Sequence, residues 1–154
     1  MLRQILYVFL ISALPVIELR GAIPVGAAMG LPIPATFIAS VAGSVLPAPF
    51  ILLFMRRVIN WLCSKSSFLD RIIHQKMRKV LKKSGKLRQG SILIALAIFV
   101  AVPLPGTGAW TGAMLAVLLD IRMKTALPAI GIGCLIAGII VIVLTYGVKS
   151  AVFG

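Results

Sequence analysis

Long runs of uncharged, mostly apolar residues divide this chain, and they indicate its fold class. No charged residue occurs in 21–55, 89–119 or 125–148. An α-helix rises about 1.5 Å per residue, so roughly 20 residues cross a hydrocarbon core of about 30 Å. Each run is long enough to span a bilayer, and the first two are longer than one span needs. The pattern predicts an all-α integral membrane protein, with residues 1–154 forming a single membrane domain.

The apolar residues fall into two halves, 1–55 and 89–148, that share one layout. A short apolar stretch is followed by a Pro/Gly break, a second short stretch and a longer span. These segments are 5–14, 15–24, 25–30 and 35–55 in the first half, and 91–102, 103–108, 109–119 and 126–148 in the second. Pro47 and Pro49 are expected to kink the first long span. Two repeats with paired broken segments are typical of a transporter, whose binding site the breaks form.

The halves are joined by a basic linker, residues 56–88, which holds 11 of the 16 Lys/Arg residues. Segments rich in Lys/Arg stay in the cytoplasm near anionic headgroups, so the linker is predicted to be cytoplasmic. Apolar residues at helical spacing from Phe68 to Leu81 predict an amphipathic helix on the membrane surface, or else a solvated connector. No aromatic residues interleave the basic ones for base stacking. We therefore expect membrane lipids, and not nucleic acid, as partners.

Two topologies fit these charges equally well. If each broken segment crosses the membrane, the chain has four spans and both termini are cytoplasmic. If each is a re-entrant hairpin, the halves are inverted repeats whose hairpin tips meet near the midplane. Both arrangements leave the same number of Lys/Arg on each side, with Arg20 at membrane depth, so the positive-inside rule does not choose. The lengths of the broken segments mildly favour hairpins of two half-depth helices.

Glu18 and Arg20 stand inside the first broken segment with uncharged residues on both sides. An ionisable residue at membrane depth is costly, and it therefore suggests a functional site. Pro15, Gly21 and Pro24 disfavour a regular helix, and in an extended stretch side chains two positions apart project to the same side. Arg20 would hold an anionic group such as phosphate, while Glu18 would exchange a proton or neutralise Arg20. The alternative is a structural ion pair at the membrane surface.

The second broken segment offers backbone groups and hydroxyls instead of charge. Its prolines remove donors, its glycines permit close approach, and the helix that follows presents free N–H groups to an anion. The alternative is a hairpin that only needs flexible backbone. No Lys-Ser/Thr pair follows the glycines, which excludes a nucleotide loop. The candidate residues here are Pro103, Pro105, Gly106, Thr107, Gly108, Trp110, Thr111 and Gly112.

Catalytic and metal-binding patterns are missing from the sequence. The chain has three acidic residues, one histidine (His74) and two cysteines (Cys63 and Cys134) that lie 71 positions apart. These make no metal-ligand spacing and no nucleophile–base pair. We expect no enzyme activity, no cofactor and no metal.

The motifs ELRGAIP at 18–24 and VPLPGTGAWTG at 102–112 resemble those of the small multidrug export protein family. These are prokaryotic membrane proteins distantly related to the DedA/VTT superfamily, and the resemblance covers nearly the full chain. It implies a multi-pass protein of the cytoplasmic (inner) membrane with two inverted repeats, each carrying a re-entrant hairpin. DedA-type relatives are associated with moving lipids, including polyprenyl phosphate carriers, and with proton-linked function. Glu18 and Arg20 would then be the acid and the arginine of the first hairpin, whereas residues 105–108 stand where the second hairpin of DedA proteins has an arginine.

The expected function is a membrane transporter or flippase for an amphiphilic substrate, either a lipid phosphate or a small drug-like molecule. Glu18 would act as a proton or charge switch and Arg20 as the anion contact, with the backbone at 106–112 completing the site. One alternative is an exporter of cationic drugs, in which Glu18 binds the cation. Another is a non-transporting assembly protein that grips anionic lipid through its linker. Because a chain with so few helices leaves little room to enclose a transport pathway, we expect a homo-oligomer.

Overall fold

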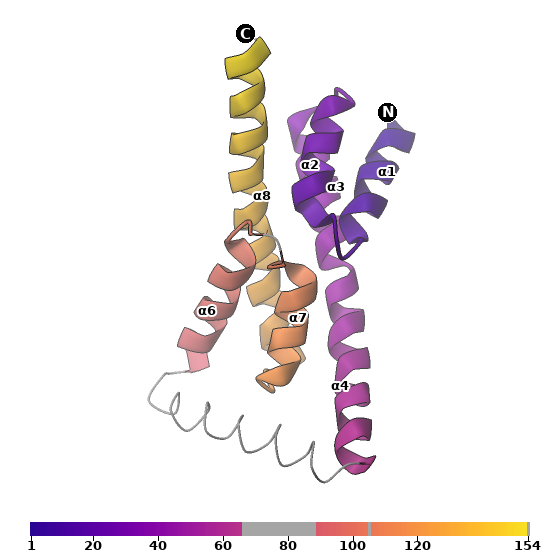
Figure 1. Cartoon of the computed structure of the whole chain (residues 1–154), viewed down its shortest axis with the longest axis vertical. Coiled ribbons are helices and arrows are strands. Elements are labelled where there is room, and N and C mark those ends of the chain that lie inside the picture. The colour runs from indigo at the N-terminus through magenta and orange to yellow at the C-terminus, as the bar shows by residue number, and fades with distance from the viewer. Residues whose placement is uncertain (66–88, 105, 154) are drawn as a thin grey trace.

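The computed structural model describes residues 1–65, 89–104 and 106–153, and every regular element within these ranges is a helix (Figure 1). The prediction of an all-α fold is thereby confirmed. Two stretches, Ile33–Ile59 and Met123–Val148, are long and apolar enough to cross a membrane. The helices are α1 (Leu2–Ala13), α2 (Glu18–Ala28), α3 (Ile33–Val45), α4 (Pro47–Lys65), α6 (Gln89–Ala101), α7 (Ala109–Leu118) and α8 (Met123–Phe153).

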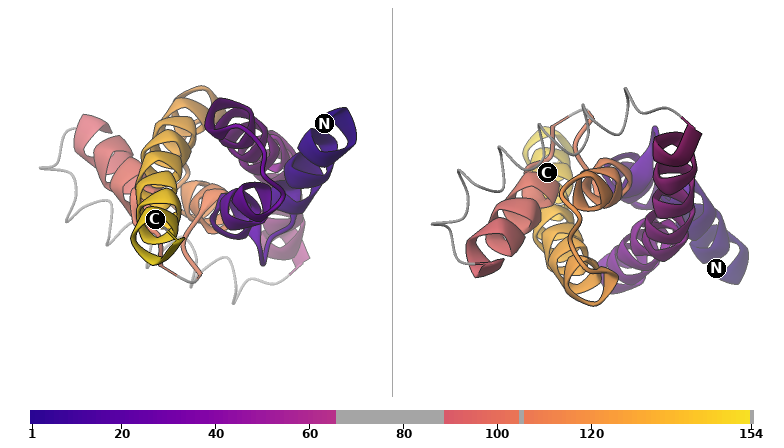
Figure 2. Two further views of the ribbon diagram at one scale, coloured as in Figure 1. Left: turned by 90° about the horizontal axis from the view of Figure 1, so that it is seen from above. Right: turned by 90° about the horizontal axis from the view of Figure 1, so that it is seen from below.

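Two short helical hairpins enter the molecule from opposite ends. Helices α1 and α2 occupy the upper half in Figure 1, and α6 and α7 occupy the lower half. The described connections at 14–17, 102–104 and 106–108 form the two hairpin tips, which meet at mid-height. Helix α8 and the consecutive helices α3 and α4 run past both tips over most of the height, and α1 and α6 lie at opposite edges of the bundle (Figure 2).

The first long span is longer than its predicted range of 35–55, and it is interrupted at Pro47, where a kink was expected. It is built from α3 and α4, which meet at Leu46 and continue to Lys65. Pro47, the first residue of α4, has no N–H to donate to the preceding turn, so the helix is interrupted there. Arg56 and Arg57, which we assigned to the linker, lie within α4. The amphipathic helix predicted for the linker lies outside the described residues.

The turns that end α2 and α7 have the same geometry, ninety positions apart. The Leu31 N–H donates to Gly26 O at 3.1 Å, and the Ile121 N–H donates to Ala116 O at 2.9 Å. The residue preceding each donor has a positive φ, 71° at position 30 and 50° at position 120. Residues 34–44 of α3 and 124–134 of α8 then show the same order of buried, half-buried and exposed positions.

The contacts of these long helices with the hairpins also correspond. Glycines on the long helices allow close approach of the hairpin helices. A Cβ added to Gly43 would meet Phe9 O and Ser12 Cβ of α1, and one added to Gly133 would meet Ala97 O and Val100 Cβ of α6. The two interfaces differ in polarity. Ser12 and Ser44 are fully buried with their hydroxyl oxygens 2.7 Å apart, whereas Val100 and Cys134 fill the matching places.

Candidate functional site

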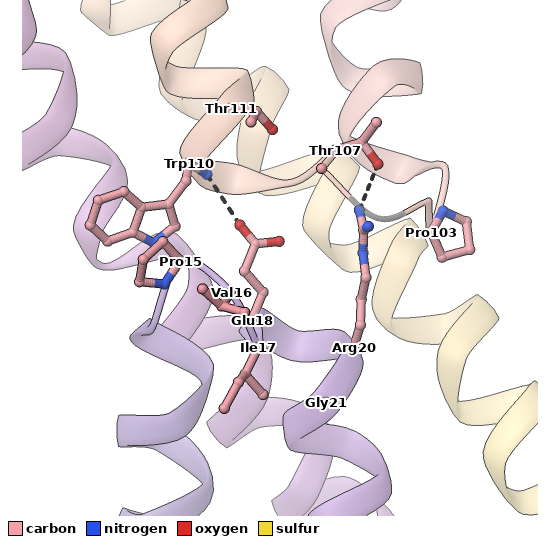
Figure 3. A pocket seen from close by; sticks show the side chains of 11 residues that line it. Pro15, Val16, Ile17, Glu18, Arg20, Gly21, Pro103, Thr107, Trp110 and Thr111 are labelled. Carbon is pink, nitrogen blue, oxygen red and sulfur yellow. Dashed lines mark hydrogen bonds between the residues drawn. The ribbon is translucent and has the colours of Figure 1, made fainter.

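A cavity of about 650 Å³ lies between the two hairpin tips (Figure 3). Its walls come from the first tip and the start of α2, and from the second tip and the start of α7. The lining residues are Pro15, Val16, Ile17, Glu18, Arg20, Gly21, Pro103, Gly106, Thr107, Trp110 and Thr111. The two broken segments of the sequence therefore meet around one space.

The unwound backbone is shorter than predicted. We expected an extended stretch over 15–24, but α2 already begins at Glu18 and contains Arg20, Gly21 and Pro24. A proline inside a helix removes one hydrogen bond and crowds the carbonyl four residues earlier, but α2 is stabilised by the packing of its buried face, which includes Ala22 and Ile23. Glu18 itself has φ 49°, a left-handed conformation that is unfavourable for a residue with a side chain.

The Glu18 carboxylate lies at the start of α7, in the other hairpin. The backbone N–H of Trp110 donates to its Oε1 at 3.3 Å, and Glu18 is only 6% exposed. Gly108 makes room for this arrangement, because a Cβ at that position would overlap the carboxylate. Its backbone, with φ 158° and ψ −166°, also belongs to a region that is essentially restricted to glycine. Glu18 therefore caps the N-terminus of α7 from a distant part of the chain.

The Arg20 guanidinium interacts with the other end of the same hairpin. Its Nη2 donates to the Thr107 hydroxyl at 2.8 Å and to Val102 O, just past the end of α6, at 3.2 Å. Both acceptors are neutral oxygens. Glu18 and Arg20 do not pair with each other among the contacts of the described residues, so the ion-pair interpretation does not describe this arrangement. Their side chains instead run side by side toward the second hairpin (Figure 3).

Trp110 makes the reciprocal contact. Its indole N–H donates to Ala13 O, at the end of α1, at 3.2 Å. Each hairpin thus supplies a donor to the carbonyl end of the first helix of the other hairpin: Arg20 to α6, and Trp110 to α1. These hydrogen bonds, together with the one between Trp110 and Glu18, join the two tips.

The remaining predicted residues take different positions. Gly21, Pro103, Gly106 and Thr111 line the cavity. Pro24 is exposed and does not line it, Gly112 packs against Val100, and Pro105 lies outside the described residues. Sequence reasoning missed the apolar wall formed by Val16 and Ile17, although both stand inside the predicted break. It also missed the carbonyls of Ala13 and Val102, which no residue type signals.

The electrostatics of the cavity are uneven. Within the described residues the half-buried Arg20 has hydroxyl and carbonyl partners but no carboxylate partner. The N-terminus of α7, a positive helix end, faces the same space. Glu18 is the acid that lines the cavity, and it is bound at α7. The part of the chain that the structure describes contains no cluster of three or more potential metal ligands.

The family model described as "Putative small multi-drug export protein" matches residues 18–140. The chain belongs to this family. No curated protein and no solved structure matches it. The family match runs from Glu18 at the first hairpin tip through α7 and into α8, so it includes most of the residues that line the cavity. Together with the apolar helices it indicates a membrane protein, consistent with a transporter.

Proposed function

We propose that this protein is a membrane transporter that moves an amphiphilic substrate through the cavity between its two hairpin tips. The cavity carries this proposal, because charged groups and an apolar wall meet there at the middle of long apolar helices. Arg20 and the start of α7 would contact a polar headgroup, and Val16 and Ile17 would contact an apolar portion. The family name, which refers to drug export, supports a transport role.

The membrane arrangement that we propose is an inverted repeat of two re-entrant hairpins in a multi-pass protein. The matched turns after α2 and α7 support the repeat. Helices α1 and α7, with 12 and 10 residues, extend about 18 and 15 Å, which is half of a hydrocarbon core. Helix α8, with 31 residues, extends about 46 Å and crosses it fully. The end with the α7–α8 turn and the ends of the linker would be cytoplasmic.

Thiol labelling tests this topology. In a background without the native cysteines, Lys124→Cys is placed in the α7–α8 region and Met29→Cys in the α2–α3 turn, where both residues are exposed. A membrane-impermeant maleimide on intact cells should label position 29 and reach position 124 only after permeabilisation. Labelling of both positions in intact cells would instead indicate the four-span arrangement, and the re-entrant proposal would be wrong.

The substrate class that we propose has an anionic headgroup of the phosphate type, either on a lipid or on a small amphiphile. The supporting observation is Arg20, whose positive charge faces the cavity with neutral oxygens as its hydrogen-bond partners. Guanidinium binds phosphate through several N–H groups, and the start of a helix adds further donors. Glu18 would respond to the substrate as a charge or proton switch.

Reconstituted transport tests the roles. Purified protein in liposomes is assayed for translocation of a fluorescent lipid phosphate and of a short-chain alkyl phosphate, which separates a lipid from a soluble source of the headgroup. Arg20→Gln should abolish flux by removing the anion contact, and Glu18→Gln should change it. Asp120→Asn, an acid at an exposed turn outside the cavity, is the control and should transport like the natural protein. Unchanged flux in both cavity variants would contradict the proposal.

Export of cationic drugs is the second candidate, and one observation favours it. Glu18 and Trp110 both line the cavity, and a site that combines an acid with an aromatic residue is suited to an organic cation. In that case a lipophilic cation, and no phosphate amphiphile, would be transported, and Arg20→Gln would raise its affinity because a competing charge is lost.

The other expectations also stand as proposals. We propose that the protein is not an enzyme, uses no cofactor and binds membrane lipids but not nucleic acid. It would reside in the prokaryotic inner membrane and assemble as a homo-oligomer, and the relation to the DedA/VTT superfamily is proposed on the same footing. If the basic linker served only to grip anionic lipid in an assembly protein, reversing its charges would abolish function while Glu18→Gln would have no effect.

A further inference from the structure

We infer that the Glu18 carboxylate occupies the anion position of the cavity and competes there with the anionic group of the substrate. The identity of the competing anion rests on the proposed function. The new element is the role of Glu18: it is a tethered ligand of α7 that the substrate must displace.

The first observation is where the carboxylate binds. The start of α7 presents free N–H groups and a positive dipole end, which is the kind of place that phosphates and carboxylates occupy. Glu18 accepts from the N–H of Trp110, although it comes from a hairpin 92 positions earlier in the chain. The carboxylate thus takes the position of a bound anion.

The second observation is that the backbone is shaped to hold it there. Glu18 is almost fully buried in a left-handed conformation, and Gly108 leaves its Cβ space to the carboxylate. Unfavourable backbone conformations of this kind persist at ligand sites where the surrounding structure enforces them. A side chain that served only as a helix cap would be provided more simply by Ser, Thr, Asp or Asn at position 108.

The third observation is that the carboxylate is not among the hydrogen-bond acceptors of Arg20. Glu18 contacts α7, while Arg20 contacts the second hairpin through Val102 and Thr107, both neutral acceptors. A phosphate-type group has several oxygens and can accept from α7 and from Arg20 together. The anion of the substrate therefore has more partners in the cavity than the carboxylate that it displaces, so binding of the substrate anion is favoured.

Tryptophan fluorescence provides the test. The chain has two tryptophans, so Trp61→Phe leaves Trp110, whose backbone N–H is at the contested position, as the reporter. The protein in uncharged maltoside detergent is titrated with dodecyl phosphate. Glu18→Gln should bind it about tenfold more tightly, because a neutral acceptor holds the α7 N–H about half as strongly as a carboxylate does.

A charge-conserving variant separates displacement from simple repulsion. Glu18→Asp keeps the negative charge but is one methylene shorter, so it should no longer reach the Trp110 N–H. Competition for this position predicts tighter dodecyl phosphate binding in Glu18→Asp as well, whereas repulsion alone predicts the natural affinity. Aspartate also tolerates the left-handed backbone at this position better than glutamate does, so the variant should fold.

Controls complete the design. Asp120→Asn should bind like the natural protein, and Arg20→Gln should lose binding. The inference is overturned if Glu18→Asp binds no more tightly than the natural protein, or if dodecyltrimethylammonium binds and Glu18→Gln abolishes its binding. The transport proposal fails separately: tighter binding in both Glu18 variants, with no flux in liposomes, would leave competition standing and contradict transport.

Discussion

The contact between Glu18 and Gly108 leads to a quantitative prediction about the junction of the two hairpins. Gly108→Ala places a methyl group where the Glu18 carboxylate lies, so the carboxylate must leave its position at α7. The substitution should therefore be costly in the natural protein. It should be much less costly when Glu18 is first replaced by alanine, because the overlapping group is then absent.

The size of the effect follows from two contributions. Displacing the carboxylate breaks the hydrogen bond from the Trp110 N–H, and a hydrogen bond to a charged group contributes about 1.5–3 kcal/mol. Forcing alanine into a glycine-restricted conformation adds about 1–3 kcal/mol. Only the second contribution remains in the Glu18→Ala background. The coupling between the two positions should be about 2 kcal/mol, which corresponds to roughly 4–8 °C in melting temperature for a chain of this size.

Thermal unfolding of four purified proteins in mild detergent measures this coupling: the natural chain, Glu18→Ala, Gly108→Ala and the double variant. Gly108→Ala should lower the melting temperature by roughly 4–8 °C less in the Glu18→Ala background than in the natural chain. Gly131→Ala is a matched control, since a Cβ there meets nothing within 4 Å, and its effect should be the same in both backgrounds. If Gly108→Ala is equally damaging with and without Glu18, the carboxylate does not occupy the space that we assign to it.

Three further predictions concern the packing around the site. Gly43→Ala should lower the free energy of unfolding by about 1–3 kcal/mol, because the new methyl meets the Phe9 carbonyl of α1. Gly131→Ala alone should raise the free energy of unfolding by about 0.5–1 kcal/mol, because the new methyl meets nothing. Thermal unfolding measures both. Trp110→Phe keeps the aromatic surface but loses the donor to Ala13 O, so the melting temperature should fall by about 2–4 °C. Thr107→Val removes a hydrogen-bond acceptor of Arg20, so the melting temperature should fall by about 2–4 °C in the same assay.

The uncharged runs predicted some of the helices, and prolines located their interruptions only in part. The runs contain α3, α6 and α7 and most of α8, where a bilayer leaves the backbone no other partner for its N–H and C=O groups, whereas α1 precedes the first run and α4 extends beyond it. Pro47 begins a helix, as a breaker should, yet Pro24 lies inside α2. The difference lies in packing: the buried face of α2 stabilises the helix around Pro24, and a sequence does not show which helices bury a face against a neighbour.

Residue types indicated the site, but they did not predict the hydrogen-bond partners of its charged side chains. Glu18 and Arg20 were recognisable because charge at membrane depth is unusual. Their pairing with each other was inferred from spacing alone. In the structure both side chains instead contact the second hairpin. Glu18 accepts from the Trp110 N–H, and Arg20 donates to the Val102 carbonyl. Backbone donors and acceptors are present at every position, so only the fold determines which of them face a side chain some ninety positions away.

The asymmetry between the two broken segments has a geometric reason in the proposed inverted repeat. The matched turns pair each residue of α2 with the residue ninety positions later, so Glu18 corresponds to Gly108 and Arg20 to Trp110. Residues that a two-fold axis exchanges approach each other near that axis, and the Glu18 carboxylate does lie against Gly108. Two side chains do not fit there together. A glutamate in one repeat therefore requires a glycine in the other, and one acid serving both hairpins is what this packing allows.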